Sequence, residues 1–230
     1  MTILFLIRHG LTGQTGTTLY GRTGGIPLDH RGQAQAERLA ARFDGVKLTA
    51  LYSSPLERCV QTVEPLAAAQ RLRMDVREEL IEIDAGTWTG KPLQRLRQLK
   101  AWHEVQTSPA TFRFPGGESF GQARDRAVAE IERIAKRHRH GRVGVATHGD
   151  IVRLLLNHYS GAGLDAFQRM VADTASVSVL AIGGGRAAVL LVNDTVGALR
   201  RFGPGQIDAP WEVTTDGVKG AQPGPKNLRR

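Results

Sequence analysis

Cysteine is almost absent from this chain of 230 residues: Cys59 is the only one, so no internal disulfide can form. No apolar run approaches the roughly 20 residues that span a bilayer. The apolar opening MTILFLI is too short for a signal peptide, and Arg8 and His9 interrupt it at once. From these absences we expect a soluble, cytoplasmic protein without a membrane partner.

Acidic residues are scarce relative to basic ones, with 22 Asp and Glu against 31 Lys and Arg and a net charge of +9. This balance favours anionic partners, which include nucleic acids and small phosphorylated molecules. Aromatic residues make up only 6% of the chain and form no stripe with basic ones, which argues against nucleic acid. The densest basic block, residues 136–140, ends a helical pattern and is interpreted as a solvated helix end.

Short apolar strands alternate with amphipathic helices along the chain. Strands are predicted at residues 3–7, 49–53, 143–147, 176–182 and 187–193, with short extended pieces within 73–82. Helices are predicted at 29–43, 54–69, 93–106, 118–138, 150–158 and 164–172. This order predicts a three-layer α/β/α sandwich with a mostly parallel central sheet. We interpret residues 1–202 as a single domain and the Gly/Pro-rich residues 203–230 as a tail that is poorly ordered or wraps the surface.

Polar residues with chemical potential follow two of these strands directly. Arg8-His9-Gly10 comes after the strand at 3–7, and Thr147-His148-Gly149 comes after the strand at 143–147. Ligands of open α/β sheets bind beyond the carboxyl ends of the strands, so the two histidines are expected in one crevice. Each glycine allows backbone to approach a ligand closely.

The strand at 49–53 leads into Ser54-Pro55-Leu56-Glu57, which we interpret as a capping box with proline at the first helical position. Arg58 then lies in the first turn of the helix, where the helix N-terminus offers positive potential to an anion. Arg8, Arg58, His9 and His148 are therefore expected around one tetrahedral dianion.

Six segments in a fixed order carry a family resemblance. They are LIRHGLT at 6–12, GIPLDHRGQAQA at 25–36, LYSSPLERCVQT at 51–62, ELIEIDAGTWTG at 79–90, FPGGES at 114–119 and VATHGD at 145–150. With these segments the sequence resembles the histidine phosphatase superfamily, which has the phosphoglycerate-mutase-like fold, and in particular its phosphatase branch.

The resemblance implies a metal-independent phosphomonoesterase that uses no cofactor and works through a phosphohistidine. It makes His9 the nucleophile, Glu82 the general acid, and Arg8, Arg58 and His148 the phosphate ligands, with His148 protonated. These roles suit the residues, because neutral imidazole is a good nucleophile and guanidinium groups bind phosphoryl oxygens. Burial would raise the pKa of Glu82 and the two arginines would lower it; the sequence leaves that balance open.

Two positions depart from the family pattern. Leu11 stands where Glu or Gln often follows the RHG motif, and Thr15 stands where an asparagine commonly contacts the phosphate. Thr12, Thr15 and Gly149 are predicted as further phosphate contacts.

Other chemistries remain as alternatives or are excluded. A phosphoglycerate-type mutase is the nearest alternative, and a non-catalytic module that binds phosphate or nucleic acid is the alternative from another class. A cysteine phosphatase is excluded because Pro65 stands where its arginine should follow Cys59. We expect the partner to be a small phosphorylated metabolite or inorganic phosphate, with no nucleic acid; the resemblance is compatible with a homodimer.

Overall fold

A six-stranded sheet forms the centre of the computed structural model, which describes residues 1–206. Its strand order is β4-β3-β6-β1-β7-β8, and the first four strands are parallel. The last two form an antiparallel hairpin on the edge beside β1. The strands are β1 (Thr2–Arg8), β3 (Ala50–Ser53), β4 (Met74–Val76), β6 (Arg142–Thr147), β7 (Val177–Gly183) and β8 (Arg186–Asp194).

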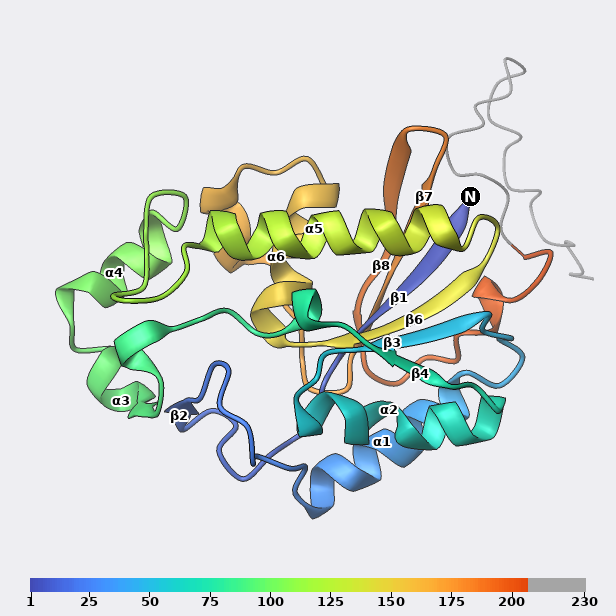
Figure 1. Ribbon diagram of the computed structural model, residues 1–230, viewed down its shortest axis with the longest axis horizontal. Helices are drawn as coiled ribbons and strands as arrows, with labels where there is room; N and C mark the ends of the chain where they lie inside the picture. Colours follow the sequence, from blue (N-terminus) through green and yellow to red (C-terminus); the bar gives the residue numbers. More distant parts are fainter. Residues whose placement is uncertain (207–230) are drawn as a thin grey trace, which may run out of the picture.

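Helices cover both faces of this sheet, as Figure 1 shows. One face is covered by α1 (His30–Arg42) and α2 (Glu57–Gln70), and the other by α5 (Phe120–Arg137) and α6 (Gly149–Tyr159). The predicted three-layer sandwich with a mostly parallel sheet is therefore confirmed. Smaller elements are α3 (Leu93–Leu96), α4 (Lys100–Thr107), the short pair β2 (Thr18–Leu19) and β5 (Lys91–Pro92), and the 3-10 turns Glu78–Leu80, Gly86–Trp88, Leu164–Arg169 and Arg200–Phe202.

Strand β1 lies in the middle of the sheet and is buried on both faces. Leu4 and Leu6 pack into the core under α5 and α6, whereas Ile3, Phe5 and Ile7 pack into the core under α1 and α2. Because side chains alternate between the two faces of a strand, the continuous run ILFLI is what a strand covered on both sides requires.

The helix predicted at 93–106 is wrong as one continuous element, because the chain turns between α3 and α4. Leu96 and Val105 are both buried in the same core cluster. In an unbroken helix these two side chains would lie on opposite faces. The turn, in which the Leu99 N–H donates to the Leu96 carbonyl over 3.0 Å, allows both to reach the core.

The capping box predicted at residues 54–57 is also wrong. Helix α2 begins at Glu57, its N-cap is Leu56, and no side chain caps it. The Ser54 hydroxyl lies 2.7 Å from Nε2 of His148, whereas the backbone N–H of Leu56 is 3.4 Å away. The hydroxyl that was expected to cap the helix is thus engaged with His148, which comes directly after the neighbouring strand β6.

The predicted tail at 203–230 lies outside the described residues except for 203–206, and the domain boundary at residue 202 stays a prediction. Among residues 1–206, no helix combines the length and the apolarity needed to cross a bilayer.

Helix α1 approaches the loop after β1 so closely that only glycine fits at position 32. A Cβ at Gly32 would collide with the carbonyl group of Leu11. We predict that Gly32→Ala lowers the free energy of unfolding by about 1–3 kcal/mol, since either the helix or the loop must shift. Gly121→Ala in α5 is the matched control, because the nearest atom to its Cβ would be 3.7 Å away. The control should gain up to about 1 kcal/mol from helix propensity. Urea unfolding of both variants measures the difference, and equal stability changes would contradict the clash.

Candidate active site

The parallel pairing of β1 with β6 brings the two predicted site histidines together. Arg8 pairs with Thr147 at the carboxyl ends of these strands, and the His9 N–H donates to the Thr147 carbonyl over 3.0 Å. The rings of His9 and His148 follow directly, with their centroids 5.4 Å apart. Both residues are almost completely buried, at 2% and 0% exposure.

The His9 ring is held in one tautomer. Its Nδ1 lies 2.8 Å from the Gly10 carbonyl oxygen, which can only accept, so Nδ1 carries the hydrogen. Burial, together with the charges of Arg8 and Arg58, lowers the pKa of His9 to about 3. The ring is therefore neutral at physiological pH, and Nε2 keeps its lone pair.

Thr62 in α2 anchors the backbone beside His9. Its hydroxyl accepts from the Gly10 N–H over 2.8 Å and donates to the Arg58 carbonyl over 2.6 Å. The loop after β1 and the first turns of α2 are thus joined through one fully buried side chain. We did not predict this contact, and its only sequence signal is that Thr62 lies one helical turn after Arg58.

Arg58 is fully buried, which is rare for a charged side chain. Its two Nη atoms donate to the carbonyls of Gly21 over 2.7 Å and Thr23 over 3.0 Å. Its guanidinium carbon lies 4.7 Å from the ring centroid of Tyr20, a distance at which cation–π attraction operates. The ring of Tyr20 is in turn 6.3 Å from that of His9.

Arg8 passes over Gly149 on its way into the site. A Cβ at position 149 would lie 3.1 Å from Nε of Arg8, so glycine gives this side chain its room. Nη1 of Arg8 donates to the Ala172 carbonyl over 2.5 Å. Within residues 1–206, Nε of Arg8 and Nε of Arg58 are both buried without a hydrogen-bond partner. Two buried cationic donors whose charges both act on His9 are suited to bind an anion.

His148 lies between Ser54 and Cys59. The Ser54 hydroxyl is 2.7 Å from Nε2, and the Cys59 sulfur is 3.4 Å from the same atom. Burial, followed by the charges of His9 and Arg58, lowers the pKa of His148 well below its usual value. Without a ligand, the neighbouring cations and the dry environment both favour the neutral ring, and the protonated state expected of His148 beside a phosphoryl group stays a prediction.

Burial affects the pKa of the Glu82 carboxyl group more than the charges of the neighbouring arginines do. Burial and the charge of Asp150 raise its pKa to about 7. The Ile83 N–H, which donates to Oε1 over 2.9 Å, and the charges of Arg58 and Arg8 lower it by less. Burial thus outweighs the cations in the balance that the sequence left open, and the raised pKa favours the protonated carboxyl.

The departures from the family pattern give the loop after β1 its own internal bonds. The hydroxyls of Thr12 and Thr15 lie 3.0 Å apart, and the Thr12 N–H donates to the Thr15 hydroxyl over 3.0 Å. The Leu11 N–H donates to the side chain of Gln35 in α1 over 2.8 Å. Both threonines shape the loop, and their contact with phosphate stays a prediction.

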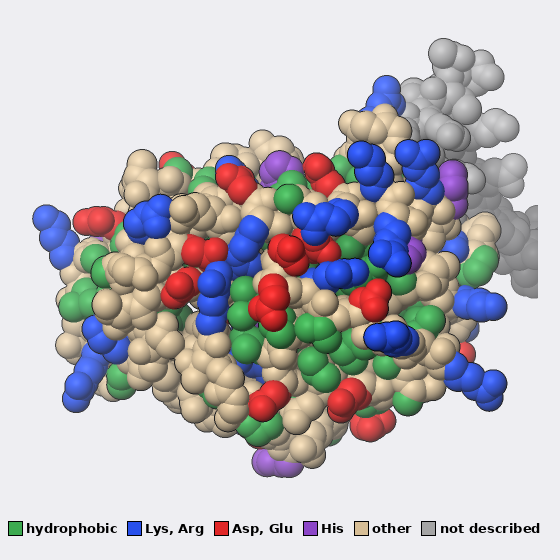
Figure 2. Space-filling model, viewed as in Figure 1, with side chains coloured by type: hydrophobic (Ala, Val, Ile, Leu, Met, Phe, Trp, Pro, Cys, Tyr) green, Lys and Arg blue, Asp and Glu red, His purple; other side chains and the backbone are tan. Residues whose placement is uncertain are grey.

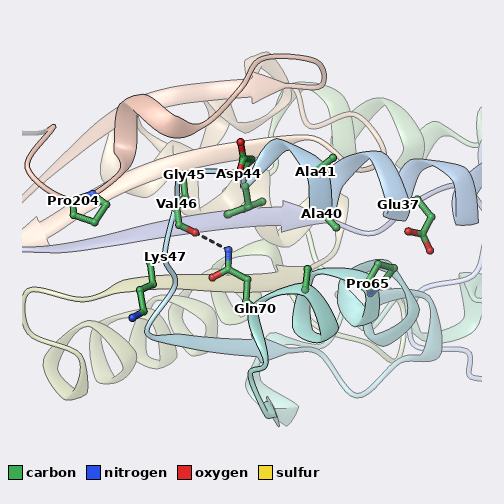
Figure 3. Close-up of a pocket in the computed structure, with 12 residues that line it drawn as sticks. Glu37, Ala40, Ala41, Asp44, Gly45, Val46, Lys47, Pro65, Gln70 and Pro204 are labelled. Atoms are coloured by element: carbon green, nitrogen blue, oxygen red, sulfur yellow. Dashed lines mark hydrogen bonds between the residues drawn. The ribbon is translucent and has the colours of Figure 1, made fainter.

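Two hollows lie on the α1 side of the molecule. A hollow of about 550 Å³ borders the loop after β1 and reaches Arg8 and Thr15. A larger groove of about 750 Å³ lies between α1 and α2, where the Gln70 side chain donates to the Val46 carbonyl over 2.6 Å (Figure 3). Its lining within residues 1–206 includes none of the predicted site residues.

Within the same range, no three His, Cys, Asp or Glu side chains are grouped so as to hold a metal ion. Basic and acidic side chains are interspersed on the face shown in Figure 2. Arg8 and Arg58 supply positive charge beside His9, since the charges of both lower the pKa of its ring.

Comparisons with known proteins find relatives that match most of this chain. Phosphoserine phosphatase 1 of Hydrogenobacter thermophilus is 30% identical over 203 residues, which cover 85% of this chain and 93% of that protein. A Proteus mirabilis protein named probable phosphoglycerate mutase GpmB is 28% identical over 181 residues, 77% of this chain and 84% of its own. The solved structure of Bacillus stearothermophilus YhfR superposes with a TM-score of 0.78 at 28% identity, covering 83% of this chain and 96% of that one. A family model described as the histidine phosphatase superfamily (branch 1) matches residues 4–195, and the chain therefore belongs to that superfamily.

Proposed function

We propose that the protein is a metal-independent phosphomonoesterase that acts on a small phosphorylated substrate through a phosphohistidine on His9. The observation that carries this proposal is the state of His9, a neutral ring whose Nδ1–H is bound to the Gly10 carbonyl and whose Nε2 keeps the lone pair needed for attack. The Nε donors of Arg8 and Arg58, which have no hydrogen-bond partner within residues 1–206, supply the charge that a phosphoryl group needs.

In the first step, Nε2 of His9 attacks phosphorus while the bond between phosphorus and the ester oxygen breaks. The leaving oxygen takes the proton of Glu82, whose raised pKa keeps a large fraction of the carboxyl groups protonated at neutral pH. Arg8 and Arg58 stabilise the charge that spreads over the phosphoryl oxygens. The products are the free alcohol, a phosphohistidine and a Glu82 carboxylate.

In the second step, water attacks the phosphorus of the phosphohistidine. The Glu82 carboxylate takes a proton from that water, and the bond between phosphorus and Nε2 breaks. Inorganic phosphate leaves, and His9 returns to its neutral form. The same pair of residues thus completes the cycle without a net change in protonation.

A phosphoglycerate-type mutase would share the first step and return the phosphoryl group to a second hydroxyl. One relative is named a probable phosphoglycerate mutase, whereas the relative covered over 93% of its length is named a phosphatase. Hydrolysis is our choice because the segment FPGGES at 114–119 resembles the phosphatase branch of the superfamily. Stimulation by a bisphosphorylated acid with little release of phosphate would favour the mutase.

The first test is hydrolysis of p-nitrophenyl phosphate in excess chelator. We predict turnover that resists the chelator and that falls at least about 1,000-fold in His9→Ala, because the nucleophile is lost. His103→Ala is the matched control, since His103 is exposed on α4, and it should keep wild-type activity. Turnover that survives in His9→Ala would refute the phosphohistidine mechanism, and loss of activity with chelator would refute metal independence.

The second test uses pH. Glu82 must be protonated to act as the acid, so kcat/KM for phenyl phosphate should fall as pH rises above the Glu82 pKa of about 7. In Glu82→Gln the alkaline fall should disappear and the rate at neutral pH should drop by about 100-fold or more. Protonation of His9, whose pKa is about 3, should not yet lower kcat/KM at pH 5, because the ring is still neutral there.

Glu78→Gln serves as the control for the pH profile, because Glu78 is exposed on the same segment. It should retain the alkaline fall. A profile for Glu82→Gln that still falls above neutrality would assign the acid to another group.

A further inference from the structure

The segment that carries Glu82 is not part of the sheet, so its carbonyl groups need other partners. The 3-10 turn Glu78–Leu80 comes shortly after the short strand β4, and residues 79–82 include the end of this turn and the two residues after it. Arg126 of α5 donates through Nη1 to the carbonyls of Glu79 over 2.7 Å and Ile81 over 2.8 Å. Thr147 donates its hydroxyl hydrogen to the Leu80 carbonyl over 2.6 Å. Side chains thus replace the backbone partners that a strand would have provided.

The carbonyl of Glu82 itself is held from two directions. Nη2 of Arg126 donates to it over 3.0 Å, and Nε of Arg22 donates to it over 2.9 Å. These two arginines come from distant parts of the chain, the loop before α1 and the middle of α5. A carbonyl group that accepts hydrogen bonds from two guanidinium groups has little freedom to rotate or to shift.

Glu118 joins the two arginines to each other. Its Oε1 lies 2.9 Å from Nε of Arg126 and 2.9 Å from Nη2 of Arg22. Its Oε2 accepts from Nη2 of Arg126 and from the Asp84 N–H, both over 3.1 Å. Burial works to raise the pKa of Glu118, but the hydrogen bonds from Arg126 and Asp84 and the charges of both arginines hold it below its usual value. The carboxylate is therefore charged and bridges the pair.

The charges of this group nearly cancel. Arg22 also lies 3.9 Å from the Asp84 carboxylate, so two cations face two anions. An unbalanced cation at the Glu82 carbonyl would favour the ionised carboxyl and oppose its role as an acid. A balanced pair can hold the backbone tightly without that penalty.

We propose that Arg126, bridged by Glu118 to Arg22, is a positioning residue that aims the Glu82 carboxyl at the leaving oxygen of the substrate, an inference that rests on the proposed function. Arg126 touches neither substrate nor phosphate in this scheme; it acts through the Glu82 backbone. Its loss should therefore weaken proton donation and leave the attack by His9 nearly intact. A 1 Å displacement of an acid is enough to cost about 100-fold in rate.

The test compares two substrates that differ in their need for an acid. Phenyl phosphate has a poor leaving group that needs a proton, whereas p-nitrophenyl phosphate has a good one that leaves without it. We expect Arg126→Lys to lower kcat/KM for phenyl phosphate by about 10–100-fold and for p-nitrophenyl phosphate by no more than about 3-fold. Lysine keeps the charge but cannot reach three carbonyls at once with a planar fork.

Arg124→Lys is the matched control, because Arg124 lies on the same helix and pairs with its neighbour Asp125. It should leave both rates unchanged.

Arg22→Lys is the second variant. It weakens the hydrogen bond to the Glu82 carbonyl from the other side and leaves the carbonyls of Glu79 and Ile81 bound to Arg126. It should show the same selective loss on a smaller scale. Circular dichroism and the melting temperature establish that each variant is folded.

Each outcome decides the inference. A selective loss with phenyl phosphate, accompanied by a flatter alkaline limb, supports positioning of the acid. Equal losses with both substrates, no loss, or a selective loss in Arg124→Lys would each overturn it while wild-type hydrolysis still stands. If Arg126→Lys fails to fold, the substrate ratio of Arg22→Lys decides in the same way. A wild-type protein that hydrolyses neither substrate would refute the proposed function, and the inference with it.

Discussion

The register between β1 and β6 is the constraint on which the site depends. Arg8 at the end of β1 pairs with Thr147 at the end of β6, and a histidine follows each of them. This pairing therefore places the two rings side by side at one edge of the sheet. A slip of one residue would turn each side chain to the opposite face of the sheet and separate them. The apolar residues of β1, which fill two different cores, resist such a slip. Packing far from the chemistry thus fixes the geometry of the chemistry.

Burial then sets the charge of the groups that the register brings together. The same exclusion of water lowers the pKa of His9 and raises that of Glu82, so both favour their neutral forms. Arg8 and Arg58 bring positive charge to the same place, and that charge is one cause of the lowered pKa of His9. The reacting groups of His9 and Glu82 thus favour neutral forms beside the cations Arg8 and Arg58. Because neither reacting group neutralises the arginines, their positive potential acts on the ligand.

The fold and the central residues were predictable from the sequence because their signals are local. A buried strand, the RHG and THG motifs and the place of Arg58 after SSPLE are each read from a few neighbouring letters. Contacts between distant segments gave no such signal. Local rules favour Ser54 as a helix cap, and only the position of His148, directly after β6, shows why the Ser54 hydroxyl is engaged elsewhere. The hydrogen bonds from Arg126 to the carbonyls of Glu79 and Glu82 likewise join residues more than forty positions apart, and no sequence motif indicates this contact.

Cys59 has a further consequence as the only thiol of the chain. It lies in α2 without solvent exposure, against His148 and the Thr147 carbonyl, and burial raises its pKa above the usual value for a thiol. In the closed structure the thiol is therefore protonated and out of reach of alkylating reagents. It can be labelled only when α2 separates from β6. The rate at which a thiol reagent labels Cys59 therefore reports how often the structure opens locally at the site.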